Sequence, residues 1–325
     1  METFFETVAQ HRGGYILRPD LLDLGMDDRQ IRDALRQKLI VRLRAGTYAP
    51  RGHQELTAEH RHRLLAFAVQ DKLPSGIVIS HHSAAVIHTG VAFGMDLETV
   101  HVTRRGGMTA RSEAGVVHHG GVLPDTDVVE VDGHHVVVPA RAALETAVVA
   151  GAEAGLVQTS FALRSGVESA ELEQRLEAMA RWPGVTKVRL SVLWASPDCE
   201  SVGEVRSLYM FRMGGIPVPR MQVEFFDSFG TSVGRVDFDW EDFWHTGEFN
   251  GLMKYGRLNP YGSADVGQAV VDEKRREDRI RESGRGMSRW VWADLHSPAA
   301  TCRRIREAME RSRRLYGPPV RTVVV

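Results

Sequence analysis

The chain has 325 residues, of which 43% are hydrophobic and 26% are charged, and this composition is typical of globular rather than disordered proteins. At roughly 100–200 residues per domain, the length predicts two or three domains. Lys and Arg number 41 against 42 Asp and Glu, which gives a formal net charge of −1. A surface that binds nucleic acid must therefore be a local patch of positive charge.

The cysteines and the apolar segments indicate which cellular compartment to expect for the protein. Cys199 and Cys302 stand far apart in the sequence and predict neither a disulfide framework nor a zinc site. The first residues lack the basic and apolar regions of a signal peptide. No uninterrupted apolar run reaches the length of about 18 residues that a membrane span needs. We therefore expect a cytoplasmic protein without a membrane partner.

Residues 1–51 show the pattern of a winged helix-turn-helix domain. Apolar residues at helical spacing predict a first helix over about residues 3–11, and a short second helix follows Pro19. After a turn at Gly25, Asp27 or Asp28 can cap a third helix that runs to about Leu39. Residues 40–49 then alternate like the two strands of a hairpin.

This order of elements suits DNA binding, because the third helix can lie in the major groove while its apolar stripe holds it against the first two helices. Basic side chains on the hairpin can meet phosphates, which provide most of the affinity. A small helical cap without a ligand is the alternative. The predicted contacts to double-stranded DNA are Arg29, Gln30, Arg32 and Arg36 on the helix and Arg42 and Arg44 on the hairpin.

Residues 52–198 predict an α+β middle domain that ends in a helical linker. A helix over about residues 57–69 leads into a buried strand, short strands follow up to residue 138, and the pattern is then mainly helical. Neighbouring residues on a strand point to opposite faces, so a His-His pair offers at most one ligand to a site. The spacing matches no metal-binding motif, and we expect surface and half-buried histidines at His81-His82, His118-His119 and His134-His135.

Residues 199–325 predict a compact α/β domain. A helix opens at Ser201, three strands follow near residues 221–226, 233–240 and 243–249, and a longer helix over about 265–282 precedes a last strand at 288–292. The final segment is a basic helix around residues 303–314, which can either track phosphates or be solvated.

Carboxylates on two neighbouring strands of this domain are candidate metal ligands. Asp237 and Glu248 can meet near one end of their hairpin, and two oxygen ligands suit Mg²⁺. Such an ion could activate a water for attack on a phosphodiester. Glu204 on the preceding helix could supply a third carboxylate, and Lys254 could stabilise the charged transition state. The alternative is that Asp237 and Glu248 are ordinary strand and turn residues.

The order of Glu204, the segment 236–240 and the segment 248–255 resembles the PD-(D/E)xK nuclease superfamily, in particular the branch similar to very-short-patch-repair endonucleases. The resemblance implies a restriction-endonuclease-like fold, with Glu204, Asp237, Glu248 and Lys254 in catalytic positions. The usual lysine two residues after the glutamate is replaced here by Asn250, which can orient a water but carries no charge. This departure bears on catalysis rather than on fold.

The N-terminal half is similar to AbiEi-type antitoxins of type IV toxin–antitoxin and phage-defence systems. The similarity rests on the segments 14–16, 21–26 and 31–48 and on the later segments 80–85 and 136–145. It implies operator binding and autorepression, with a cognate toxin as a further partner.

Three functions follow as hypotheses. The first is a DNA-binding regulator of the antitoxin type that carries a nuclease-like domain. The second is an active Mg²⁺-dependent DNA endonuclease targeted by its winged helix. The third is a non-catalytic protein that binds a partner such as a toxin.

Overall fold

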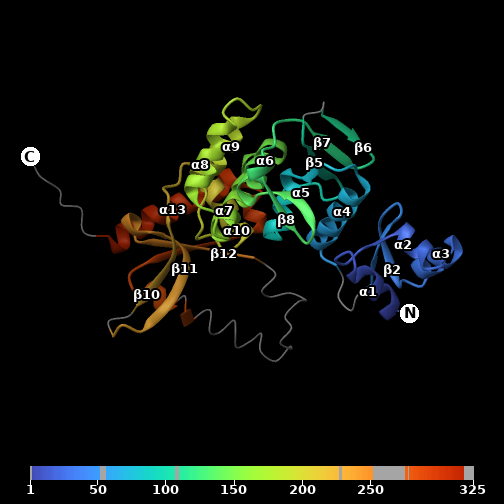
Figure 1. Ribbon diagram of the computed structural model, residues 1–325. Coiled ribbons are helices and arrows are strands. Elements are labelled where there is room, and N and C mark those ends of the chain that lie inside the picture. Colours follow the sequence, from blue (N-terminus) through green and yellow to red (C-terminus); the bar gives the residue numbers. More distant parts are fainter. Residues whose placement is uncertain are drawn as a thin grey trace, which may run out of the picture. The chain divides into compact units, whose positions relative to one another are not determined.

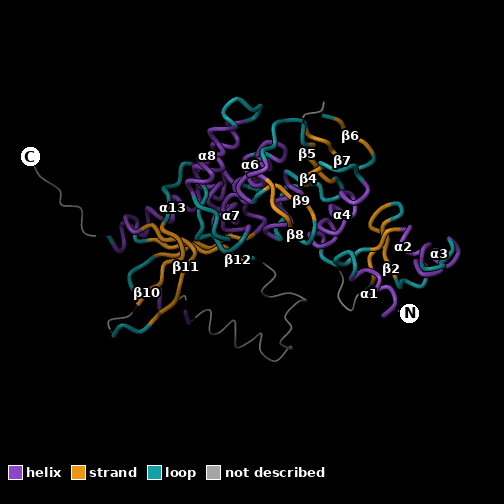
Figure 2. The backbone as a smooth tube through the Cα atoms, viewed as in Figure 1, coloured by secondary structure: helices purple, strands orange, loops and turns teal. Residues whose placement is uncertain are grey.

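The computed structural model describes residues 2–51, 56–106, 110–226, 229–251, 275–276 and 278–317. These residues have an α+β fold whose strands form three sheets (Figures 1 and 2). The chain divides into two compact units, Met1–Ala195 and Ser196–Val325, so the boundary predicted between residues 198 and 199 lies close to the division. Among the helices of the described residues, none is both long and apolar enough to cross a membrane.

The first unit opens with the succession of helices and hairpin that the sequence predicts for a winged helix. The strands form an antiparallel sheet in the order β1-β3-β2. Their bounds and those of the helices are α1 Glu2–Gln10, β1 Ile16–Leu17, α2 Arg18–Asp23, α3 Asp28–Arg36, β2 Ile40–Arg44 and β3 Thr47–Pro50.

Helix α3 ends earlier than its apolar pattern predicts. Asp27 caps the helix by accepting a hydrogen bond from the amide of Gln30 at 2.8 Å. Lys38 has a left-handed backbone with φ of 58°, and this conformation stops the helix before Leu39. Ile31 and Ala34 remain on the buried face of α3, as their helical spacing predicts.

The rest of the first unit is a six-stranded mixed sheet covered by helices. The strand order is β6-β7-β5-β4-β9-β8, with β4 parallel to β9 and β5 parallel to β7. The elements are α4 Ala58–Lys72, β4 Ile77–Ile79, α5 His81–Thr89, β5 Val100–Arg104, β6 Arg111–Glu113, β7 Val116–His119, η1 Asp125–Asp127, β8 Val128–Val131, β9 His134–Val137, α6 Pro139–Ala150, α7 Ala152–Arg164, α8 Ser169–Ala178 and α9 Val185–Trp194.

The predicted winged helix has a hydrophobic core of its own, but some of its residues also join the core of the middle domain. Tyr15, Leu17 and Leu43 from the first 51 residues are buried in the same cluster as Leu64 and Phe67 of α4. Polar contacts cross the same junction, since Lys72 donates to the hydroxyl of Thr47 at 2.7 Å. Residues 1–195 therefore pack as one unit, although the sequence predicts a domain boundary at residues 51 and 52.

The second unit has a four-stranded sheet in the order β10-β11-β12-β13. Strands β10, β11 and β12 form an antiparallel meander, and β13 runs parallel to β12. The predicted helix over 265–282 lies largely outside the described residues, although 275–276 and 278–282 are helical. The elements are α10 Val202–Gly214, β10 Arg220–Phe226, β11 Ser232–Trp240, η2 Glu241–Phe243, β12 His245–Asn250, β13 Gly286–Val291, α12 Trp292–Leu295 and α13 Pro298–Tyr316.

Aromatic side chains form the core between α10 and this sheet. The ring of Phe211 on α10 meets those of Phe238, Trp240 and Trp290 edge-on, each at 5.3 Å between centroids. Helix α10 approaches β12 so closely that a Cβ on Gly203 would lie 1.9 Å from the ring of Phe249. Glycine at this position therefore brings the start of α10, which carries Glu204, against the sheet.

Candidate nucleic-acid interface and buried polar clusters

The outer face of α3 carries the predicted DNA-contacting side chains. Arg29 and Arg32 are exposed and form no hydrogen bond or direct ion pair with a described residue. Gln30 is exposed too, but its amide oxygen accepts from the backbone amide of Asp27 at 2.8 Å as part of the helix cap. Arg36 pairs with Asp33 on the same helix. Within the described helix, Arg29 and Arg32 are thus the cations best placed for an external anion.

The two hairpin arginines have different environments. The side chain of Arg42 is exposed on β2. The guanidinium of Arg44 instead donates to the carbonyl of Ala114 at 2.8 Å, and Arg61 of α4 donates to the carbonyl of Arg42 at 2.9 Å. The hairpin is therefore fixed to the middle part of the unit, and Arg42 is the hairpin side chain that remains turned to solvent.

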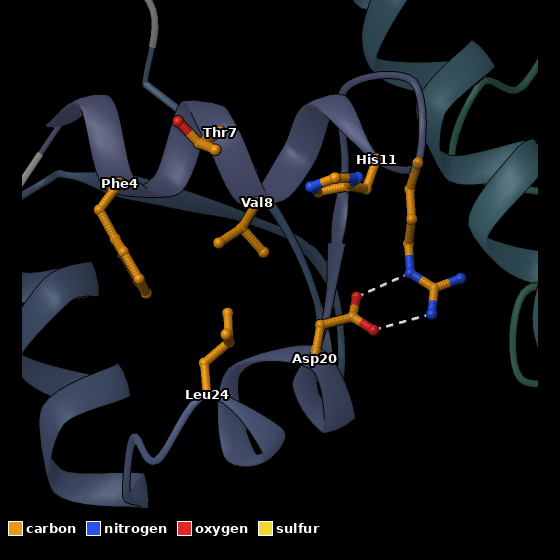
Figure 3. Close-up of a pocket in the computed structure, with 7 residues that line it drawn as sticks. Phe4, Thr7, Val8, His11, Asp20 and Leu24 are labelled. Atoms are coloured by element: carbon orange, nitrogen blue, oxygen red, sulfur yellow. Dashed lines mark hydrogen bonds and ion pairs between the residues drawn. The ribbon is translucent and has the colours of Figure 1, made fainter.

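A pocket of about 600 Å³ lies between α1 and α2, on the helical side of the winged helix (Figure 3). Phe4, Val8 and Leu24 line its apolar part. The ion pair of Arg12 with Asp20, at 2.7 Å, closes one side. The pair also ties the end of α1 to α2, and Asp20 in addition accepts the backbone amide of Leu17 at the start of α2. This pocket thus belongs to the packing between α1 and α2.

Glu204 is buried and fully used by its neighbours. It accepts from the hydroxyl of Ser201 at 2.6 Å and the amide of Glu200 at 2.8 Å, while Ser201 caps α10 by accepting the amide of Glu204 at 3.3 Å. Its second oxygen also accepts from the side-chain amide of Gln222 at 2.9 Å. The carboxylate of Glu204 therefore has a structural role, because it holds the start of α10 in place and attaches this helix to β10.

Asp237 and Glu248 lie on adjacent strands, as predicted. Phe238 pairs with Gly247, which brings their neighbours Asp237 and Glu248 side by side across β11 and β12. One oxygen of Asp237 accepts the amide of Phe249 at 2.8 Å.

Two arginines bind the carboxylate of Glu248, which is only 5% exposed. Arg276 donates to one oxygen at 2.6 Å, and the Nε of Arg289 donates to the other at 2.9 Å. Arg289 is also the residue opposite Glu248 in the β12–β13 register. The sequence analysis missed both partners, which stand 28 and 41 residues away. The signal available to it was the number of arginines in the segment 275–289.

The remaining predicted site residues add little to this cluster. Asn250 is half-buried at the end of β12, opposite Val291. Lys254 lies outside the described residues. The three carboxylates of Glu204, Asp237 and Glu248 do not form a group whose oxygens all lie within metal-binding reach of one another.

Histidines gather in the first unit, although the sequence favours scattered ones. Within the described ranges, His81, His101 and His119 are the only three residues of ligand type that each place one ligand atom within 4.8 Å of the others. His81 begins α5, His101 lies on β5 and His119 ends β7. The pair His118-His119 on β7 gives one member to the group, as the alternation of a strand requires, and the pair His81-His82 at the start of α5 also gives one. The sequence could not show that a third, unpaired histidine would complete the group.

The comparisons with known proteins are sparse. No protein-family model matches the chain, and no curated protein matches it. Among solved structures, the chain is similar to the Rv2827c protein from Mycobacterium tuberculosis, with 13% sequence identity and a TM-score of 0.37. The similarity covers 69% of this chain and 87% of that chain.

Proposed function

We propose that this chain is a DNA-binding regulator of the antitoxin type, in which residues 1–51 contact double-stranded DNA. The observation that carries the proposal is the outer face of α3. Arg29 and Arg32 are exposed there without direct partners, while Ile31 and Ala34 fix the opposite face in the core. A helix held in this way can present cations to the major groove.

Ion pairs within the winged helix indicate which of its cations are available to contact DNA. Arg12 is paired with Asp20, Arg18 with Asp28 and Arg36 with Asp33. Because these pairs neutralise one another, the positive charge left for phosphates is carried by other cations, which include Arg29, Arg32 and Arg42. A local patch of this kind is what a chain with a net charge of −1 requires. The AbiEi resemblance adds a cognate toxin as the second partner.

Phosphodiester hydrolysis is not included in the proposal. Mg²⁺ needs several oxygen ligands, but both oxygens of Glu248 are bound by guanidinium groups. Glu204 is likewise engaged by its helix cap and by Gln222. A divalent cation would have to displace Arg276 and Arg289 before it reached Glu248. The second unit therefore supports a structural or DNA-holding role better than a catalytic one.

The proposal is tested by fluorescence anisotropy with two duplexes of about 40 base pairs, one taken from upstream of the protein's own gene and one scrambled. We expect the full chain to bind both, more weakly as salt rises, and the upstream duplex more tightly. Arg29→Ala combined with Arg32→Ala is expected to weaken binding at least about tenfold and to make the salt dependence shallower. Arg42→Ala is expected to act in the same direction, and Arg44→Ala much less.

The matched control is Lys187→Ala combined with Arg189→Ala, which removes the same charge from exposed positions on α9. Equal loss of binding in this control and in the α3 variant would contradict a specific role for α3. Incubation of the same duplexes with Mg²⁺ provides a second readout. Cleavage that disappears in Asp237→Ala would assign the endonuclease function instead.

A further inference from the structure

The histidine group in the first unit is built by three separate elements, the neighbouring strands β5 and β7 of the six-stranded sheet and the helix α5. Strand β5 pairs with β7 in parallel, with His101 opposite Val117 and Thr103 opposite His119. Strand β4 pairs with β5 on its other side and leads directly through Ser80 into α5. His81 has a left-handed φ of 53° at this junction. A conformation that costs energy in a non-glycine residue is kept where the surrounding structure requires the side chain to point a particular way.

The rings are close enough to share a ligand. The Nε2 atom of His119 lies 2.9 Å from the Nδ1 atom of His101, and the rings of His81 and His119 stack with centroids 3.5 Å apart. In a tetrahedral zinc site with Zn–N bonds of about 2.0–2.1 Å, nitrogen ligands stand about 3.3–3.4 Å from one another. The first pair therefore needs to open by a few tenths of an ångström, and the stacked rings need to splay. Rotation of three side chains provides both movements.

Burial disfavours the protonated form of all three imidazoles. It lowers the pKa of His101 to about 3 and that of His119 to about 4, and it holds the pKa of His81 well below its usual range. The neutral ring is the form of histidine that binds metals.

Glu145 supplies the outer contact that metal-bound histidines usually have. Its carboxylate is fully buried, and one oxygen lies 3.3 Å from Nδ1 of His81 and 3.0 Å from the backbone amide of the same residue. The other oxygen accepts from Arg141 at 2.7 Å. Ser80 lies 3.0 Å from the same Nδ1 atom. With Nδ1 facing these oxygens, Nε2 of His81 is the nitrogen left for a ligand.

We propose that His81, His101 and His119 bind one first-row transition-metal ion, with Zn²⁺ as the best fit. Three imidazoles suit Zn²⁺, Co²⁺ and Ni²⁺ better than the hard cations that prefer oxygen. The three nitrogens leave one position of a tetrahedron for water or another small ligand. Glu145 orients His81 from outside the coordination sphere. This site uses none of the residues on α3 that the proposed function assigns to DNA contacts.

The test uses the full chain after removal of metals with EDTA and exchange into chelator-free buffer. Titration with ZnCl₂ by calorimetry is expected to give one ion per chain, bound more tightly than about 1 µM. Titration with CoCl₂ is expected to give the intense visible absorption of four-coordinate Co²⁺. His119→Gln and His101→Gln are each expected to weaken Zn²⁺ binding at least about 100-fold. Glu145→Gln is expected to weaken it about 10–100-fold.

The control is His135→Gln, which alters an exposed histidine on β9 outside the group and is expected to keep wild-type affinity. Circular dichroism of each variant establishes that it is folded before its affinity is compared. Wild-type protein that fails to take up stoichiometric Zn²⁺ or Co²⁺ would overturn the proposal and leave the histidines as a hydrogen-bonded core. Binding that persists in both His119→Gln and His101→Gln would overturn it as well, because the ion would then lie elsewhere.

Discussion

The carboxylate of Glu248 shows how one residue's partners decide its role. Its side chain is 6% exposed and lies between Arg276 and Arg289, whose side chains are 22% and 25% exposed. The buried anion is therefore held by two cations, and Asp237 on the adjacent strand adds a second carboxylate beside it. Removal of one cation leaves that anion short of a partner, and such losses are costly in a protein interior.

We expect Arg289→Met to lower the free energy of unfolding by about 3 kcal/mol, since Glu248 then keeps only Arg276. Urea unfolding followed by tryptophan fluorescence measures this, because Trp240 and Trp290 lie in the same unit. The control Arg304→Met breaks an ion pair with Asp294 whose side chains are 52% and 28% exposed. It should cost about 0–1 kcal/mol. Equal effects of the two substitutions would show that Glu248 does not depend on Arg289.

The sequence predicted that Asp237 and Glu248 lie on adjacent strands, but it did not predict which side chains contact them. Adjacent strands were predictable from alternation, so Asp237 and Glu248 were correctly placed beside each other. Their partners were not predictable, because Arg276 follows a segment outside the described residues and Arg289 comes from the last strand of the sheet. A sequence does not distinguish a carboxylate that is bound by guanidinium groups from one that binds a metal ion.

At the scale of single elements, α3 depends on the capping residue that precedes it, Asp27. Asp27 accepts the amide of Gln30, and the side chain of Gln30 returns a bond to the amide of Asp27, both at 2.8 Å. A short helix of nine residues has few other bonds at this end. The cap thus orders the turn that carries Arg29 and Arg32.

We expect Asp27→Ala to destabilise α3 by about 1 kcal/mol, and Asp27→Asn to have little effect because Asn caps helices as well as Asp does. Both substitutions remove one negative charge, so a comparison between them isolates the cap. Hydrogen–deuterium exchange of peptides that cover residues 28–37 provides the measurement, with faster exchange expected in the alanine variant alone. Equal protection in the two variants would contradict the capping role.

The order of elements was the most predictable part of the fold. Helical spacing placed Ile31 and Ala34 on the buried face, and alternation placed the hairpin after them. Packing between distant elements was less predictable, because Arg44 reaches the carbonyl of Ala114 across 70 residues. The cluster that Tyr15, Leu43 and Phe67 share was not predictable for the same reason. An apolar pattern indicates which residues are buried, but it does not indicate which other elements they pack against.

At the scale of the whole first unit, buried histidines couple stability to pH. Burial lowers the pKa of His62 to about 4, that of His101 to about 3 and that of His119 to about 4. An unfolded chain takes up protons on these rings as the pH falls below about 6.5, whereas the folded chain does not until about pH 4. The unfolded state binds more protons in this window, so stability falls with falling pH.

Each such histidine contributes about 1.4 kcal/mol per pH unit within the window. We therefore expect the metal-free protein to lose several kcal/mol between pH 7.5 and pH 5.5, measured by urea unfolding in the presence of EDTA. Glu145, whose pKa is raised by burial, opposes the trend, because the folded state holds its proton more tightly than the unfolded state. Its contribution is common to all variants compared at the same pH.

A substitution at His62 separates the histidine contribution from general acid sensitivity. His62 is fully buried and bonded to the carbonyl of Leu97 at 2.7 Å and to the hydroxyl of Ser83 at 2.9 Å, and glutamine can replace part of this pairing without titrating. His62→Gln is expected to reduce the slope below pH 6.5 by about 1.4 kcal/mol per pH unit. His135→Gln, at an exposed position, should leave the slope unchanged. If the His62 variant kept the wild-type slope, the loss of stability in acid would have to come from groups other than His62.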